Sequence, residues 1–80
     1  TGSGGARIAA YLLRGHEGAR GEVVVKLPAP KAAIASQLNL APETFSRLLS
    51  DFARRGLVHV EGRTIVVPDP ARLAAEGGRR

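Results

Sequence analysis

The sequence contains no cysteine, which excludes disulfides, thiolate metal sites and cysteine-held iron–sulfur clusters from this segment. It has no tryptophan, one tyrosine and two phenylalanines, so any core must be mainly aliphatic. No apolar run approaches the roughly 18 residues needed to cross a membrane, and no secretory signal is visible. These absences favour a cytoplasmic domain, and nothing in the segment predicts a bound cofactor or metal.

The chain is long enough for one small domain with a single core, at 80 residues. Its 12 basic residues exceed its 7 acidic ones and give a formal net charge of +5. Such an excess in a small domain favours a polyanionic partner, although a merely soluble basic surface has the same composition. The placement of the charges has to decide between these two interpretations.

Two helices joined by a tight turn are predicted over residues 31–56. The first has a short apolar stripe and ends at residues 39–42, Asn-Leu-Ala-Pro. In the second, apolar residues recur at i, i+3, i+4 and i+7, the spacing of one buried helical face: Phe45, Leu48, Leu49 and Phe52. At about 100° per residue, polar residues fall on the opposite face: Glu43, Ser46, Arg47, Ser50 and Arg54. A helix-turn-helix that contacts DNA needs this division.

The segments on the N-terminal side of this unit are short. Residues 1–5 are expected to form a linker or the boundary of an excised fragment, because they show no periodicity. Residues 6–14 predict a short helix that ends at Gly15, and residues 23–25 predict a short strand.

On the C-terminal side, residues 57–60 and 63–67 predict a β-hairpin around the turn Glu61-Gly62. A short helix is expected from Pro70 to about Glu76, followed by a disordered tail over residues 77–80. A hairpin directly after the second helix is the wing of a winged helix. We therefore predict an α+β fold, a winged helix-turn-helix DNA-binding domain over residues 6–76.

Three neighbouring side chains on the exposed face of the second helix have the chemistry of base recognition. Arginine donates two hydrogen bonds to guanine, a carboxylate accepts from cytosine, and a hydroxyl serves either way. Glu43, Ser46 and Arg47 supply these groups, and Glu43 is expected to hold Arg47 as an i, i+4 pair. An ordinary surface ion pair is the alternative when the pair is taken alone.

Phosphate contacts are predicted for three residues around this face: Lys31, Thr44 and Arg63. Lys31 begins the first helix, Thr44 lies in the first turn of the second, and Arg63 is expected in the wing turn. Arg54 and Arg55 are expected to complement the helix dipole instead. Solvated surface charge is the competing interpretation of Lys31 and Arg63.

The run APETFSRLLSDFARRGLVHVEGRTIVVPDPARL, within residues 41–73, resembles the C-terminal DNA-binding domain of the CRP/FNR superfamily of bacterial transcription regulators. The pattern ETxSRxL, followed by GLVxxxGRTIxV and DPxxL, carries the resemblance, which covers about residues 6–76. Glu43, Ser46 and Arg47 match the E-x-x-S-R triplet of the FNR-like branch, which implies a TTGAT-like half-site. The cyclic-AMP-binding branch usually has arginine where this chain has Pro42. The sequence around PETFSR is also similar, more loosely, to that of the nitrogen-oxide-responsive regulators.

The resemblance further implies a full-length homodimer on palindromic promoter DNA. It implies a sensor domain outside this segment as the place for an effector or haem. This fragment itself is expected to be a monomer that binds one half-site weakly. In this family the loop corresponding to residues 15–21 can face RNA polymerase.

Other function classes have less support in the sequence. An enzyme is not expected, because His16 and His59 have no recognisable acid or metal partner pattern and Ser46 has no base at a motif spacing. A winged helix used only for protein contacts stays open, with the Glu43/Ser46/Arg47 face meeting protein. Non-specific nucleic-acid or RNA binding is disfavoured, because Phe45 and Phe52 lie on the apolar stripe and cannot stack on bases.

Overall fold

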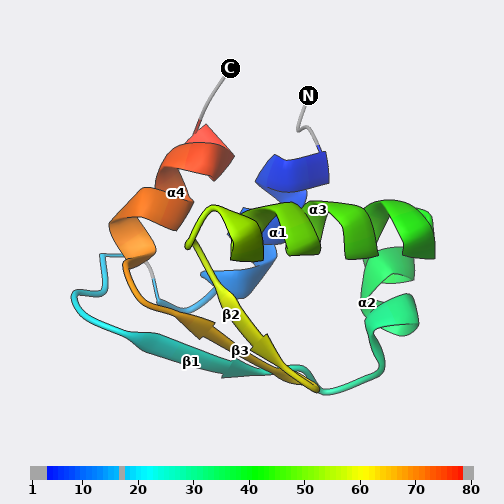
Figure 1. Ribbon diagram of the computed structural model, residues 1–80, viewed down its shortest axis with the longest axis horizontal. Coiled ribbons are helices and arrows are strands. Elements are labelled where there is room, and N and C mark those ends of the chain that lie inside the picture. The colour runs from blue at the N-terminus through cyan, green and yellow to red at the C-terminus, as the bar shows by residue number, and fades with distance from the viewer. Residues whose placement is uncertain (1–3, 17, 79–80) are drawn as a thin grey trace.

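The computed structural model describes residues 4–16 and 18–78. They form four helices and one three-stranded sheet. In chain order the elements are α1 (Gly4–Leu12), β1 (Val23–Lys26), α2 (Lys31–Gln37), α3 (Pro42–Arg54), β2 (His59–Glu61), β3 (Thr64–Val67) and α4 (Pro70–Gly78). The helix-turn-helix α2–α3 followed by the hairpin β2–β3 is the winged arrangement that the sequence predicts (Figure 1).

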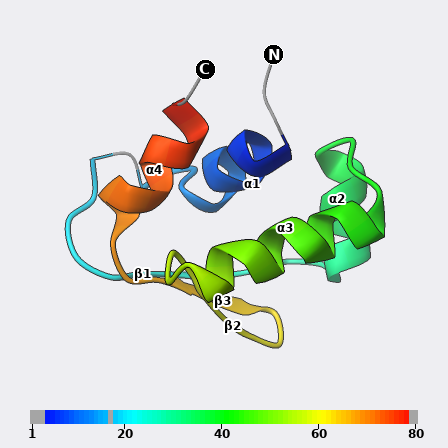
Figure 2. The ribbon, with the colours of Figure 1, turned by 45° about the horizontal axis from the view of Figure 1, so that its top comes forward.

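The sheet is antiparallel, with the strand order β1-β3-β2. Successive side chains of a strand point to opposite faces of the sheet, and residues paired across two strands share a face. The pair Val60 and Ile65 therefore lies on the inner face, and the pair Val24 and Val66 lies on the outer face. Ile65 on the inner face is fully buried, whereas Val24 on the outer face is 51% exposed. The helices lie to one side of the sheet in both views (Figures 1 and 2).

The core is aliphatic apart from Phe45 and Phe52, as the scarcity of aromatic residues requires. It joins all four helices and the inner face of the sheet, and within the described residues no polar or charged side chain is buried. The buried members are Ile8, Ala9, Leu12, Leu13, Val23, Leu27, Ile34, Ala35, Phe45, Leu49, Phe52, Leu57, Val58, Ile65, Val67 and Leu73. No helix within residues 4–16 and 18–78 has the length and apolar character to cross a membrane.

Helix α1 begins at Gly4, earlier than predicted, so the expectation of a linker over residues 1–5 is wrong for Gly4 and Gly5. Residues 1–3 lie outside the described part of the chain. A Cβ built on Gly4 would lie 2.7 Å from Leu48 Cδ1 and 3.3 Å from Leu40 Cδ2. Glycine is a poor helix former, but here its small size lets the start of α1 approach α3 and the turn before it.

Helix α4 also runs further than predicted, to Gly78 instead of about Glu76. Residues 77 and 78 therefore belong to a helix and not to the expected tail, and residues 79–80 lie outside the described part. Extension by two residues, about half a turn, costs little once a helix exists, because each added residue brings one hydrogen bond. The start is as predicted: Pro70 is the first helical residue and the Ala71 N–H donates to Asp69 Oδ1 over 3.2 Å.

The turn of the wing lies one residue later than predicted. Glu61 pairs with Thr64, which leaves Gly62 and Arg63 as the turn and puts Glu61 in strand β2. Gly62 has φ +60°, and Arg63 has no positive φ. A type II′ hairpin turn needs this combination, with glycine at its first central position, so Gly62 must come first. Arg63 consequently lies at the tip of the wing.

Candidate nucleic-acid interface

The turn between α2 and α3 is fixed by backbone hydrogen bonds that end α2. Asn39 has φ +59°, the left-handed conformation that its position predicts. The Leu40 N–H donates to the Ala35 carbonyl over 2.9 Å, and the Asn39 N–H donates to the Ser36 carbonyl over 3.0 Å. This pair of bonds is a Schellman motif, so the backbone conformation that ends α2 follows from local sequence.

Helix α3 starts without a side-chain cap. Pro42 is its first residue, and Ala41 before it has an extended backbone and no capping side chain. Amide groups of the first turn are therefore left for solvent or for a ligand, and at a helix N-terminus they favour an anion. Thr44, predicted to contact phosphate, lies in this turn and is half-buried.

The two faces of α3 lie as the periodicity predicts. Phe45 and Phe52 are each 2% exposed and Leu49 is 4% exposed, whereas Leu48 is only half-buried. The opposite face is exposed along its length: Glu43, Ser46, Arg47, Ser50 and Arg54. The structure thus brings all three predicted base-contacting side chains to one open surface.

Glu43 and Arg47 do not form the ion pair that was expected. Neither side chain has a hydrogen bond or an ion pair within the described residues. An exposed i, i+4 pair gains little in water and loses side-chain entropy, so such a pair need not form. The guanidinium of Arg47 is left free for another partner.

The far end of α3 is fastened to the rest of the domain. Gly56 has φ +78°, and the Leu57 N–H donates to the Phe52 carbonyl over 2.9 Å, a second Schellman motif. Asp51 pairs with Arg54 at 2.7 Å and with Arg55 at 3.1 Å.

Arg55 also pairs with Glu76 of α4 at 2.7 Å. Hydrogen bonds from Arg55 and then Arg54 lower the pKa of Asp51, and those to Glu76 and then Asp51 raise the pKa of Arg55. The helical spacing of Asp51 from both arginines was visible in the sequence, but the tie from Arg55 to Glu76 was not.

Of the predicted phosphate-contacting residues, Lys31 lies beside α3, and Arg63 lies beside the segment that leads to α2. Lys31 is the first residue of α2 and is half-buried, and Arg63 is exposed at the tip of the wing. The Leu27 N–H, in the segment leading to α2, donates to the Arg63 carbonyl over 2.8 Å. The wing tip is therefore attached next to the start of the helix-turn-helix. Neither Lys31 nor Arg63 has an ion-pair partner among the described residues.

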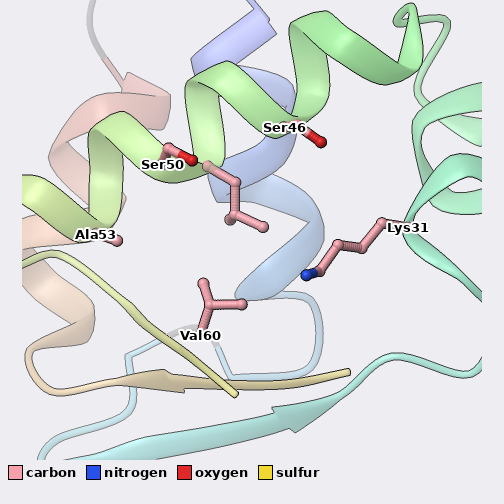
Figure 3. Close-up of a pocket in the computed structure, with 6 residues that line it drawn as sticks. Lys31, Ser46, Ser50, Ala53 and Val60 are labelled. Carbon is pink, nitrogen blue, oxygen red and sulfur yellow. The ribbon is translucent and has the colours of Figure 1, made fainter. Parts of the chain in front are cut away.

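A small open hollow lies between α3, the start of α2 and strand β2. Its volume is about 140 Å³, well below the 300–1,000 Å³ of typical small-molecule sites. Lys31 reaches into this space from α2, while Ser46 and Ser50 follow one another along α3 (Figure 3). The full lining is Lys31, Ser46, Leu49, Ser50, Ala53 and Val60. We call this space the α3–β2 hollow.

One acid partner was missed by the sequence analysis. His59 Nε2 lies 3.1 Å from Glu61 Oε2, and both side chains are exposed on β2. The strand period of two puts residues i and i+2 on one face, so this neighbour could have been predicted. Within the described part of the chain, no group of three His, Cys, Asp or Glu residues could hold a metal.

Comparison with known proteins gave one family. Residues 6–76 match the model of the Crp-like helix-turn-helix domain. The match includes all seven elements apart from the first two residues of α1 and the last two of α4. A search of curated proteins found no match.

Proposed function

The chain belongs to the family of Crp-like helix-turn-helix domains, DNA-binding domains of transcription regulators, and on that premise we propose how it recognises DNA. Helix α3 enters the major groove with its N-terminal half, and the β2–β3 wing lies on the phosphate backbone. The observation that carries this proposal is the open face of α3, where Arg47 has no hydrogen-bond or ion-pair partner among the described residues and shares the exposed surface with Glu43 and Ser46.

Each of these side chains has a defined task in the proposal. Arg47 donates two hydrogen bonds to O6 and N7 of a guanine, Glu43 accepts from a cytosine amino group, and Ser46 donates or accepts at a neighbouring base. The E-x-x-S-R triplet supports a half-site of the TTGAT type and the FNR-like branch. Lys31, Thr44 and Arg63 bind phosphates and set the register of the helix in the groove.

The parent protein is, in this proposal, a bacterial cytoplasmic regulator that binds palindromic promoter DNA as a homodimer. Its effector or haem is held in a sensor domain and not by this segment. Catalysis is not part of the proposal, since the family supports DNA binding and the His59–Glu61 pair has no nucleophile among its described partners.

A selection from random duplexes tests this function directly. The chain, fused to a dimerising coiled coil, is expected to enrich palindromes whose half-sites resemble TTGAT. The Arg47→Ala variant is expected to lose the preference for guanine at one position. Enrichment of no sequence by the unsubstituted dimer, together with retained binding to any duplex, would reduce the function to non-specific DNA binding.

A protein partner is a second candidate because of a hollow on another part of the surface. About 510 Å³ of space lies between the loop after α1 and the start of α4, and its lining is mostly apolar. Leu13, Ala19 and Pro70 are among the lining residues, with His16 and Arg20 beside them. RNA polymerase is the partner that the family implies for this loop. An Ala19→Asp variant that still binds DNA but no longer activates transcription would support it.

A further inference from the structure

We propose that the α3–β2 hollow seats one strand of the DNA backbone, with a phosphate held by Lys31 and Ser50 and a deoxyribose resting on Val60. This inference rests on the proposed function, because it specifies where a strand passes once α3 lies in the groove. It adds Ser50 and Val60 to the residues that contact DNA.

The shape and exposure of the α3–β2 hollow suit a DNA strand that passes over it. Ser46, Ser50 and Ala53 are exposed, and Val60 and Lys31 are half-buried, so the space is open along α3 and apolar at its floor. The Lys31 ammonium lies beneath α3 and faces the strand that carries Val60 (Figure 3). An ammonium group and a hydroxyl above an apolar wall match a phosphate joined to a sugar.

The charges around the hollow also favour an anion. No acidic residue lines it, and Lys31 has no ion-pair partner within the described residues. Arg54 and Arg55, further along the same helix, are paired with Asp51 and Glu76. Lys31, which lines the hollow, therefore keeps an unpaired charge, as Arg47 and Arg63 do, whereas Arg54 and Arg55 are paired with carboxylates of the described residues.

The position of Ser50 along α3 agrees with a DNA backbone at the edge of the major groove. Ser50 follows Glu43 by seven residues, which is about 10 Å along a helix at 1.5 Å per residue. The major groove is about 12 Å wide, so a helix that contacts bases with its first turn meets a backbone near this distance. Ser46, between the two, can contact either a base or the strand.

The test adds a charge to the hollow and compares it with the same charge elsewhere. In Ser50→Lys the added ammonium meets the backbone, and in the control Ala10→Lys it lies at an exposed position of α1. Binding to a labelled duplex with a TTGAT-type half-site and to a scrambled duplex is measured from 0.05 to 0.3 M salt. We expect Ser50→Lys to tighten both equally, roughly five- to tenfold at 0.1 M salt, and to steepen the salt slope by about one unit. Ser50→Asp should have the opposite effect.

Several results would overturn the proposal. One such result is a Ser50→Lys variant that behaves like Ala10→Lys. Another is a Ser50→Lys variant that alters binding at a single base pair only, which would make position 50 a base-contacting position. A stronger interaction with poly-glutamate, with duplex binding unchanged, would assign the hollow to an acidic protein. If Ser50→Lys behaves like Ala10→Lys while Arg47→Ala still loses its guanine preference, the proposed contact of the α3–β2 hollow with the DNA backbone is wrong and the proposed function stands. If the unsubstituted chain binds no duplex, both fall.

Discussion

Arg47 and Arg54 are two arginines of one exposed helical face with different environments. Arg54 donates to Asp51 at 2.7 Å, whereas Arg47 has no partner among the described residues. We expect Arg47→Ala to lose discrimination at one guanine by about 1–3 kcal/mol, because a bidentate contact to that base disappears. Fluorescence anisotropy with the matched duplex and single-base variants measures this, and Arg54→Ala is the control. Equal losses on matched and random duplexes would contradict the assignment.

Lys31 and Arg63 are expected to contribute affinity without sequence preference. Replacing either by alanine removes one cation that releases counterions from DNA, so the salt slope should fall by about one unit for each. Arg14, whose guanidinium lies 5.2 Å from the centre of the Tyr11 ring on α1, provides a control substitution. A salt titration of Lys31→Ala that overlays the unsubstituted protein would remove this residue from the phosphate contacts.

Single-residue predictions from the sequence succeeded where local geometry decides them. The helical period places Glu43 and Arg47 opposite Phe45, and the left-handed position of Asn39 follows from the break in the pattern. Local geometry does not decide whether Glu43 pairs with Arg47. An exposed ion pair contributes less than about 1 kcal/mol, so the spacing of the two residues alone does not predict that the pair forms. The contact of Arg55 with Glu76 spans 21 residues and depends on how α4 packs.

Helix α3 is held in place mainly by its apolar side. Phe45 is 2% exposed, so Phe45→Ala should destabilise the domain by about 3–5 kcal/mol through lost burial and the cavity left behind. Leu48 is only half-buried, and Leu48→Ala should therefore cost clearly less. Chemical denaturation of both variants measures the difference. An unchanged midpoint for Phe45→Ala would mean that α3 is rotated away from the described orientation.

The boundaries of elements were harder to predict than their existence. Periodicity indicated all four helices and the hairpin, yet α1 starts at Gly4, where the absence of a side chain leaves room for Leu48 of α3. That contact joins residues 44 positions apart and has no trace in the local pattern. The wing turn, in contrast, could have been placed correctly, since a type II′ turn requires its glycine first.

The charged cluster at the end of α3, Asp51 with Arg54 and Arg55, predicts how the domain responds to acid. Arg55 and Arg54 lower the pKa of Asp51 from its ordinary value of 3.8, so Asp51 stabilises the folded state above that value. This contribution is lost as the pH falls below 3.8 and through the lower folded-state pKa. Thermal melts between pH 2 and 6 should therefore show a steeper acid limb than the Asp51→Asn variant shows. Glu43→Gln, which removes a carboxylate that has no ion pair among the described residues, is the control substitution.

The molecule as a whole presents one α3 and one wing, which is enough for one half-site. Two copies held together should bind far more tightly when both helices enter the major groove on one side of the duplex, because the second binding event becomes intramolecular. We expect a coiled-coil-fused dimer to prefer half-sites with centres about 10–10.5 base pairs apart, near 34 Å, and to lose affinity when about 5 base pairs are inserted. The unfused chain should be indifferent to the insertion. A dimer that binds both spacings equally would show that its two recognition helices do not engage the duplex together.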